Sequence, residues 1–338
     1  MFMRRYIIVL AALVLLACNG NTGNGSADFR SEKKVSTHFI GDPLMVGVPV
    51  DLCVEGDYLF VLAYTPENWL HIYDKKTGEK VSDAIAFGRG PGEGVNLINM
   101  DYRREERALY LFDMVLRKTL VYALDGETAS ASYLREISHP TEGVIRKCHV
   151  LPGNRFLYEG YLPEYGKETR YTLSDGEKVI DTYSFYPGVD NENDQLAFIL
   201  GQSKADPESG RFVSGTLFGA VLECFDVSGA GIRSLATRLL DLPEMDVNHA
   251  IQMKEGKKYG FSTICLSKNL IYTCYLDNPD PNVFRTIATF DWRGREQTKY
   301  NMDQNILRMC IENERSGSFF GIASSPEMEF SLVSFILD

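Results

Sequence analysis

The residues most suited to ligand chemistry lie in one short loop, Phe87-Gly88-Arg89-Gly90-Pro91-Gly92-Glu93-Gly94. Its glycines and its proline favour a tight backbone path with positive φ angles. An arginine held on such a loop can grip a carboxylate or a phosphate with its planar guanidinium. Alternatively, Arg89 and Glu93 pair within the loop and simply hold two structural units together. We therefore treat Arg89 and Glu93 as candidate ligand-binding residues, with this structural role as the alternative.

Other polar residues occupy connections of the same class, and they include His139, Asp190 and His249. We expect these three to lie on the same face as Arg89 and to contribute to ligand binding. The acidic, proline-rich loops at Pro66-Glu67 and Pro163-Glu164 are expected to open on that face as well. A face rimmed with carboxylates suits a cationic, peptide or glycan ligand. The alternative is that these loops are polar only because they are solvated.

The run Asp190-Asn191-Glu192-Asn193-Asp194 has alternating carboxylates, as calcium loops do. An EF-hand loop would need glycine at its sixth position and glutamate at its twelfth, where this chain has Gln195 and Gly201. We therefore assign no metal ligand and no cofactor, and keep Ca²⁺ as the alternative. The sequence contains no Gly-x-Ser-x-Gly, His-Glu-x-x-His or P-loop pattern, so no catalytic residue is assigned.

Repeated turns indicate which elements would position these residues. Apolar runs end in similar turns whose glycines are Gly78, Gly126, Gly176, Gly229 and Gly294, about 50 residues apart, which is a period of propeller blades. Each repeat contains short apolar and aromatic runs typical of strands. The first repeat predicts strands at 50–54, 58–64, 70–73 and 81–87. A single such sheet would have two exposed edges, whereas six packed around an axis bury their faces. The sequence thus predicts an all-β, six-bladed propeller.

The sixth repeat predicts strands at 306–311, 318–323 and 330–337, and then the sequence ends before a fourth strand. A strand-like segment without a partner, Lys34 to Ile40, precedes the first repeat. We predict that this N-terminal segment supplies the missing strand and closes the last blade.

The N-terminus has the pattern of an export signal. Arg4-Arg5 precede an uncharged apolar run from Tyr6 to Ala17, which is too short to span a bilayer. The ending Leu15-Leu16-Ala17-Cys18 resembles a bacterial lipobox and implies lipidation of Cys18, with a plain secretory signal as the alternative. We predict a signal peptide at 1–17, a flexible linker at 18–33 and the propeller at 34–338.

The positions of the cysteines within the repeats and the net charge of the chain indicate what lines the axis and which partners are not expected. Cys53, Cys148, Cys265 and Cys310 all fall in the first strand of a repeat, where we expect buried free thiols ringing the axis. The inner strands are accordingly expected to be mostly apolar or cysteine. The formal net charge is -11, so an acidic ring is not expected to bind nucleic acid or anionic lipid, and the acyl chains must provide the anchor.

The Gly-Arg-Gly-Pro-Gly-Glu loop, behind a lipoprotein signal and within these strand-turn repeats, resembles the six-bladed β-propeller lipoproteins of Bacteroidetes, which are grouped with TolB-like propellers. The resemblance covers about 300 residues in organisation, and it departs at Gly94, where an aromatic residue is expected. It implies a propeller fold and a cell-envelope location, and no established reaction.

Three functions stay open at this stage. The first is a non-enzymatic, lipid-anchored envelope module that binds a protein, peptide or glycan partner and faces the periplasm. The second is a calcium-dependent hydrolase or lyase with its site in the central channel. The third is a sensor domain of a surface signalling system. Fold analogy alone does not choose among them.

Overall fold

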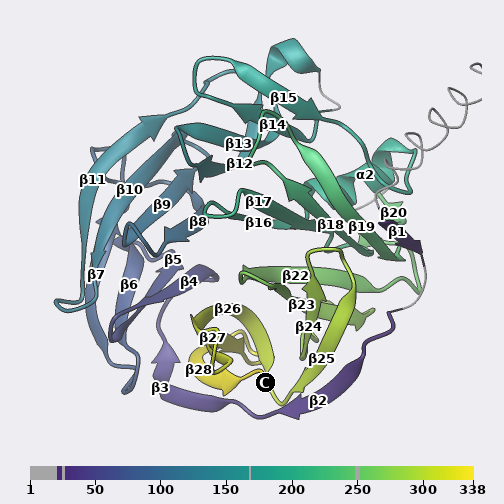
Figure 1. Ribbon diagram of the computed structural model, residues 1–338. Coiled ribbons are helices and arrows are strands. Elements are labelled where there is room, and N and C mark those ends of the chain that lie inside the picture. The colour runs from purple at the N-terminus through teal and green to yellow at the C-terminus, as the bar shows by residue number, and fades with distance from the viewer. Residues whose placement is uncertain (1–20, 25–26, 167–168, 248–251) are drawn as a thin grey trace, which may run out of the picture.

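A computed structural model describes residues 21–24, 27–166, 169–247 and 252–338. The described chain forms an all-β, six-bladed propeller in which six antiparallel sheets surround a central axis (Figure 1). Each blade runs from an inner first strand at the axis to an outer strand at the rim. The predicted fold class is therefore confirmed.

The strands follow one another in chain order within each blade. The first three blades comprise β4 (Pro49–Glu55), β5 (Tyr58–Ala63), β6 (Asn68–Asp74), β7 (Lys80–Ala86); β8 (Leu97–Arg103), β9 (Ala108–Asp113), β10 (Lys118–Asp125), β11 (Ser130–Ser138); and β12 (Val144–Leu151), β13 (Arg155–Tyr161), β14 (Tyr171–Ser174), β15 (Val179–Tyr183). The last three comprise β16 (Gln202–Asp206), β17 (Arg211–Gly215), β18 (Ala220–Asp226), β19 (Arg233–Asp241); β22 (Tyr259–Leu266), β23 (Leu270–Asn278), β24 (Thr286–Asp291), β25 (Glu296–Met302); and β26 (Asn305–Asn313), β27 (Ser318–Ser324), β28 (Phe330–Ile336) with β3 (His38–Leu44).

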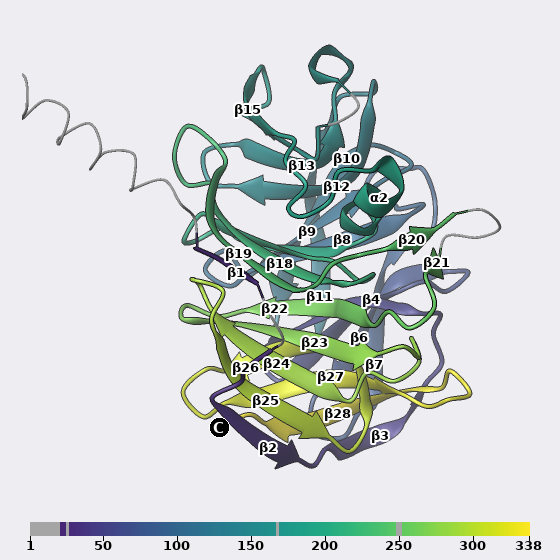
Figure 2. The same cartoon turned by 90° about the vertical axis from the view of Figure 1, so that its right-hand side faces the viewer.

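The N-terminal segment passes along the rim of three blades (Figure 2). β3 pairs antiparallel with β28, with Phe39 opposite Val333, and so supplies the fourth strand of the last blade. This confirms the predicted closure, although the strand begins at His38. Lys34 and Val35 belong instead to β2 (Ser31–Val35), which adds a parallel strand to β25. β1 (Asn21–Asn24) pairs in the same way with β19, so two strands lie in the stretch assigned to a linker.

The core is divided among the contacts between blades. Six clusters of buried apolar side chains each fill the space between two neighbouring sheets. The second strands are consequently buried on both faces, as in β5, where Leu59 to Ala63 are inaccessible. Outer strands such as β7 are more exposed, because they lie at the rim (Figure 1), where their faces are less covered by the neighbouring blades. The described cysteines are all free.

The two faces of the ring carry different kinds of connection. The hairpin face carries the turns between first and second strands. The crossover face carries the connections between blades and the loops between second and third strands. On the crossover face lie α2 (Glu192–Ile199), the 3-10 turn η1 (Pro163–Tyr165), and the small sheet of β20 (Met245–Asp246) and β21 (Gln252–Met253). Figure 2 shows α2, β20 and β21 on one side of the disc. No helix in the described part is long and apolar enough to cross a membrane.

Candidate functional site

A repeated β-bulge shapes the wall of the central channel. The pairing of the inner strand with its neighbour is interrupted at the same place in five blades. A bulge bends the strand and re-aims the next side chain. The residues that follow the bulges all line the channel, and they are Asp51, Asn99, Lys147, Thr263 and Arg308. In the blade without this irregularity, β16 contributes Gln202 and Lys204 to the same wall.

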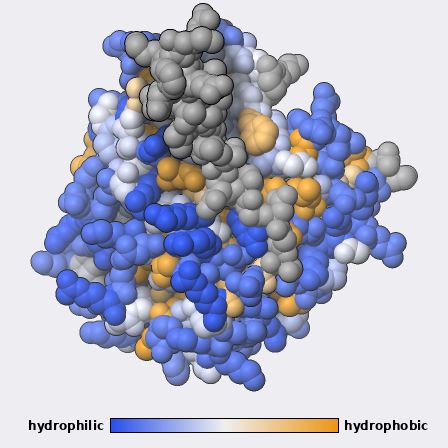
Figure 3. Space-filling view, turned by 45° about the vertical axis from the view of Figure 1, so that its right-hand side comes forward, coloured by the Kyte–Doolittle hydropathy of each residue, from blue (hydrophilic) through white to orange (hydrophobic). Residues whose placement is uncertain are grey.

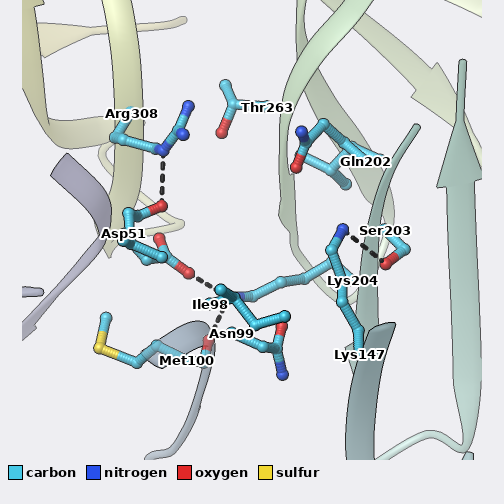
Figure 4. A pocket seen from close by; sticks show the side chains of 12 residues that line it. Asp51, Ile98, Asn99, Met100, Lys147, Gln202, Ser203, Lys204, Thr263 and Arg308 are labelled. Atoms are coloured by element: carbon cyan, nitrogen blue, oxygen red, sulfur yellow. Dashed lines mark hydrogen bonds and ion pairs between the residues drawn. The ribbon is translucent and has the colours of Figure 1, made fainter. Parts of the chain in front are cut away.

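This part of the wall is polar and contains three cations, so the expectation of a mostly apolar and cysteine lining is wrong here, although three of the four cysteines line the channel as expected. A cavity of about 40 Å³ lies among these side chains, and Figure 4 shows Lys147, Lys204 and Arg308 converging on it from different blades. The prediction failed because it did not anticipate the bulges, which change the phase of each strand. Cys53, Cys265 and Cys310 line the channel nearer the hairpin face, whereas Cys148 packs between the second and third blades.

One of the channel cations is neutralised within the protein. Lys204 Nζ lies 2.6 Å from Asp51 Oδ2 and donates a further hydrogen bond of 2.6 Å to the carbonyl of Met100. Burial alone would lower the pKa of Lys204, but the charges of Asp51 and Asp101 raise it above its ordinary value. The pair joins the first, second and fourth blades through the middle of the ring.

The other two cations have no carboxylate within ion-pair distance among the described residues. Lys147 Nζ makes only long contacts, 3.3 Å to Ser203 Oγ and 3.4 Å to the Gly201 carbonyl. Arg308 donates from Nε to the Val50 carbonyl at 2.6 Å and from Nη1 to its neighbour's carbonyl at 2.8 Å. Burial lowers the pKa of both side chains, because removal from water disfavours their charged forms.

Behind the wall, His149 lies between two buried carboxylates. Its Nδ1 is 3.1 Å from Asp101 Oδ2 and its Nε2 is 3.2 Å from Glu159 Oε1. Burial would lower the pKa of His149, but the two carboxylates raise it to about 9. Burial would raise the pKa of Glu159, but Lys147 and His149 hold it at about 2. At neutral pH the imidazole is therefore a cation within a salt-bridged cluster.

This cluster has the residue types of a serine nucleophile site but not the required proton acceptor. Ser203 Oγ lies 3.3 Å from His149 Nε2, and Asp101 contacts the other ring nitrogen. A general base must be able to accept the serine proton. The two carboxylates favour the protonated imidazole, and Ser203 donates to Glu159, so the arrangement does not present His149 as a base for Ser203. The arrangement joins the second, third and fourth blades through His149.

The loop around Arg89 joins the first two blades. The Glu93 carboxylate accepts a hydrogen bond of 2.7 Å from the backbone N–H of Gly90. Trp69 Nε1 donates to the Gly94 carbonyl at 2.9 Å, and the Tyr122 hydroxyl donates to the Gly92 carbonyl. Glu93 thus braces the loop, while the Arg89 side chain is exposed and forms no ion pair with a described residue.

The other candidates do not gather around Arg89. His139 is buried between the second and third blades, where its ring nitrogens contact Thr119 Oγ1 at 2.7 Å and the Tyr158 hydroxyl at 3.2 Å. Burial lowers its pKa to about 4, so it is a neutral core residue. Asp190 is exposed, just ahead of α2. His249 and Cys18 lie outside the described residues.

The predicted polar run after Asp190 forms the start of α2. The Asn191 side chain caps this helix by accepting a hydrogen bond of 2.8 Å from the backbone N–H of Asp194. Asp194 Oδ1 in turn accepts from the backbone N–H of Met245. The described part of the chain contains no group of three or more His, Cys, Asp or Glu side chains placed to hold a metal ion.

The two faces of the ring differ in their apolar surface. Among the described residues, seventeen large hydrophobic side chains are exposed, and twelve of them lie on the crossover face: Met45, Val48, Tyr64, Phe87, Met114, Val115, Val144, Tyr165, Phe185, Leu200, Leu242 and Met328. The other five lie on third or fourth strands, and none lies in a first-to-second-strand turn. Figure 3 shows how hydrophobic patches interrupt a mainly hydrophilic surface.

The hairpin face instead carries a hollow. A funnel of about 1170 Å³ opens there and shares Asp51, Met100, Lys204 and Ile264 with the small channel cavity. Acidic and basic side chains are mixed around it, and Arg211 lies over the Trp292 ring at 4.9 Å. The funnel and the cavity thus adjoin at these four shared residues.

These features define the chain as a closed six-bladed propeller with a polar channel. It belongs to the TolB-like 6-blade propeller-like family, which matches residues 28–314. Its fold is similar to that of a Bacteroides fragilis protein described as exported, with a TM-score of 0.57 and 13% identity, covering 93% of this chain and 100% of that one. A Lactobacillus plantarum protein matches with a TM-score of 0.45 and 11% identity, covering 88% and 90% of the respective chains. No curated protein sequence matches.

Proposed function

We propose that this chain is a lipid-anchored protein of the bacterial cell envelope that binds a protein partner on its crossover face and catalyses no reaction. The observation that carries the proposal is the uneven distribution of exposed apolar side chains between the two faces. Contiguous apolar surface rimmed by polar residues marks interaction sites, whereas scattered apolar residues do not. Among the described residues, the crossover face carries twelve of the seventeen exposed large hydrophobic side chains, of which Tyr64 and Phe87 contact each other, and the hairpin turns carry none.

Around the first two blades, the crossover face exposes aromatic, aliphatic and arginine side chains of the kinds found at the centre of protein interfaces. Tyr64 and Phe87 contact each other edge to face, with ring centroids 5.6 Å apart, and Arg89 is exposed two residues further on. Met114 and Val115 lie in the loop that leads to Lys118, whose ammonium contacts the Gly90 carbonyl at 3.4 Å. Tyrosine and arginine are enriched at interaction hot spots. Exposed methionine and valine favour a polypeptide over a glycan, because they offer neither hydrogen bonds nor a ring for stacking.

The location rests on the N-terminus. Arg4-Arg5, the apolar run and Leu15-Leu16-Ala17-Cys18 support export and lipidation at Cys18. The similar Bacteroides fragilis protein described as exported is consistent with this address. Because Asn21 already pairs with the outer edge of the fourth blade, an acylated Cys18 would hold that edge within about 11 Å of the bilayer. In the lipoproteins that the N-terminus resembles, acidic residues just after the acylated cysteine often accompany display outside the cell. The stretch from Asn19 to Ser26 has none, which favours the periplasmic side.

Site-specific photocrosslinking in the envelope tests the partner. A photoreactive residue at Phe87 is compared with one at Asn269, an exposed position in a turn of the hairpin face. We expect a discrete polypeptide adduct from position 87, lost when Tyr64 and Val115 are changed to serine, and no such adduct from position 269. An adduct that resists protease and yields to glycosidases would favour a glycan instead. Equal yields from both faces, or none, would contradict the proposal.

The anchor is tested separately. In cells, mass spectrometry of the wild-type N-terminal peptide should show an acylated Cys18 as the first residue, and Cys18→Ala should abolish this modification. A wild-type chain with an unmodified N-terminus after cleavage would show a plain secretory signal. That result would leave the partner proposal standing.

A further inference from the structure

We propose that the central channel contains an anion-binding site, built by Lys147 and Arg308, that takes a single carboxylate group of a ligand. This site lies on the inner wall and not on the crossover face, so it goes beyond protein docking. It would give an acidic chain a specific place for a negatively charged group.

The first support is that neither cation has a carboxylate within ion-pair distance among the described residues. The carboxylates whose charges act on them, Glu159 for Lys147 and Asp51 for Arg308, are each already paired with another cation. Neither Lys147 nor Arg308 forms an ion pair with a described residue, although Lys204 beside them is paired with Asp51 at 2.6 Å. Buried charges in proteins are normally paired, because an isolated charge is costly to desolvate. The position of the two cations after bulges shows that the backbone is bent to present them to the channel.

The second support is the charge balance around the cavity. The cationic groups are Lys147, Lys204, Arg308 and the imidazolium of His149, and the anionic groups facing them are Asp51, Asp101 and Glu159. When all seven groups are ionised, one positive charge is left over. Arg146 points elsewhere, because its guanidinium donates to the carbonyl of Ile199 and does not line the cavity. A monoanion neutralises this excess, whereas a phosphate dianion would overcompensate it.

The third support is the presence of free neutral donors beside the cations. The side chains of Gln202 and Thr263 line the cavity and form no hydrogen bond with described residues. Arg308 Nη2 likewise has no partner among them, so the outer edge of its guanidinium is available for a planar acceptor. Figure 4 shows Arg308, Thr263, Gln202 and Lys147 around one opening. Carboxylate oxygens are acceptors that these groups can contact together.

The size of the cavity limits what enters it. A volume of about 40 Å³ accommodates a carboxylate group or one to two water molecules but not a whole organic ligand. The rest of the ligand would therefore lie outside the cavity, and the funnel of about 1170 Å³, which shares Asp51 and Lys204 with the cavity, has room for it. The structure thus points to a ligand with a terminal carboxylate, and its larger part in the funnel.

Calorimetric titration of the folded propeller with sodium acetate tests the site. Sodium chloride and sodium phosphate at equal ionic strength serve as competing anions. We expect acetate to bind above the chloride background, and Lys147→Met and Arg308→Met each to weaken acetate binding about tenfold. Lys178→Met, which removes an exposed lysine on the third blade, should leave it unchanged.

Two further measurements keep the test decisive if a variant folds poorly. Circular dichroism checks each variant, and in the wild-type protein the NMR signal of the Lys147 ε-carbon should shift on adding acetate. Acetate that gives no more heat than chloride, or binds all variants equally, overturns the site. Phosphate that binds more tightly than acetate overturns its assignment to a carboxylate. The crosslinking at Phe87 is unaffected by either result.

Discussion

Arg170 and Arg308 are both buried arginines, but their surroundings are opposite. Arg170 lies between the third and fourth blades, where Nη2 is 2.6 Å and Nη1 is 3.2 Å from the two oxygens of Glu223. Nη1 also donates to the Phe185 carbonyl at 2.6 Å. Arg308 has two backbone carbonyls and no carboxylate partner among the described residues.

The difference separates a structural charge from one that is available for binding. The bidentate pair with Glu223 completes the coordination of Arg170 within the protein, so nothing more is needed from a ligand. Arg308 keeps unused donors at the axis, where all six blades meet. The same contrast applies to the lysines, since Lys204 is paired with Asp51 and Lys147 is not.

The largest change in the free energy of unfolding is expected at Arg170, the buried arginine with a carboxylate partner. Arg170→Met should lower the free energy of unfolding by about 3–5 kcal/mol, because it leaves Glu223 buried without a counter-charge. Urea denaturation measures the change. The double variant Arg170→Met with Glu223→Leu should recover much of the loss. A single variant within about 1 kcal/mol of wild type would show that the pair does not stabilise the ring.

The two buried histidines should give opposite pH dependences. The pKa of His149 is raised from 6.5 to about 9, so its stabilisation is complete below pH 6.5 and is lost as the pH rises through about 9, up to about 3 kcal/mol. The pKa of His139 is lowered to about 4, so stability instead falls as the pH drops from 6.5 through about 4.

Denaturation of wild type, His149→Gln and His139→Gln across this pH range measures both effects. Buried thiols also lower stability at alkaline pH, because burial raises their pKa, so the readout is the difference between wild type and variant. We expect His149→Gln to flatten the alkaline side and His139→Gln the acidic side. An unchanged alkaline slope in His149→Gln would mean that the imidazole is not charged.

A smaller change is expected at the channel cation. Lys147→Met should lower the free energy of unfolding by about 1–2 kcal/mol, because it removes a desolvated charge with only long hydrogen bonds but also one of the charges that keep Glu159 ionised. This contrasts with the large loss in Arg170→Met and is measured in the same urea series. A loss as large as that of Arg170→Met would show that Lys147 is a structural partner of Glu159.

The smallest change in stability is expected on the surface. Val115→Ser on the crossover face and Asn269→Ser on the hairpin face should each stay within about 0.5 kcal/mol of wild type. Only Val115→Ser should reduce the yield of the partner crosslink from Phe87. Equal reduction by both variants would show that the two faces do not differ in binding.

The sequence predicts the strands closely where the apolar pattern is strong. The first repeat was expected at 50–54, 58–64, 70–73 and 81–87, and β4 to β7 differ by at most two residues at each end. The residues of the channel wall could not be predicted in the same way, because a bulge changes which residues of a strand face the axis and leaves no regular pattern in the sequence. One feature of the sequence could have indicated these wall residues. Asp51, Thr263 and Arg308 each lie two residues before a cysteine of an inner strand.

The sequence by itself determined the blades and their number, because apolar runs and turn glycines act locally and recur about every 50 residues. The missing fourth strand of the last repeat indicated that the N-terminus closes the ring. The sequence also carried the export pattern that ends at Cys18. Only the tertiary structure decided which polar residues meet. Lys147, Arg308 and Gln202 are far apart in the chain, and their convergence depends on how six bulged or regular strands approach a common axis. His139 and His149 are likewise indistinguishable as letters, and the neighbouring blades alone make one neutral and the other charged.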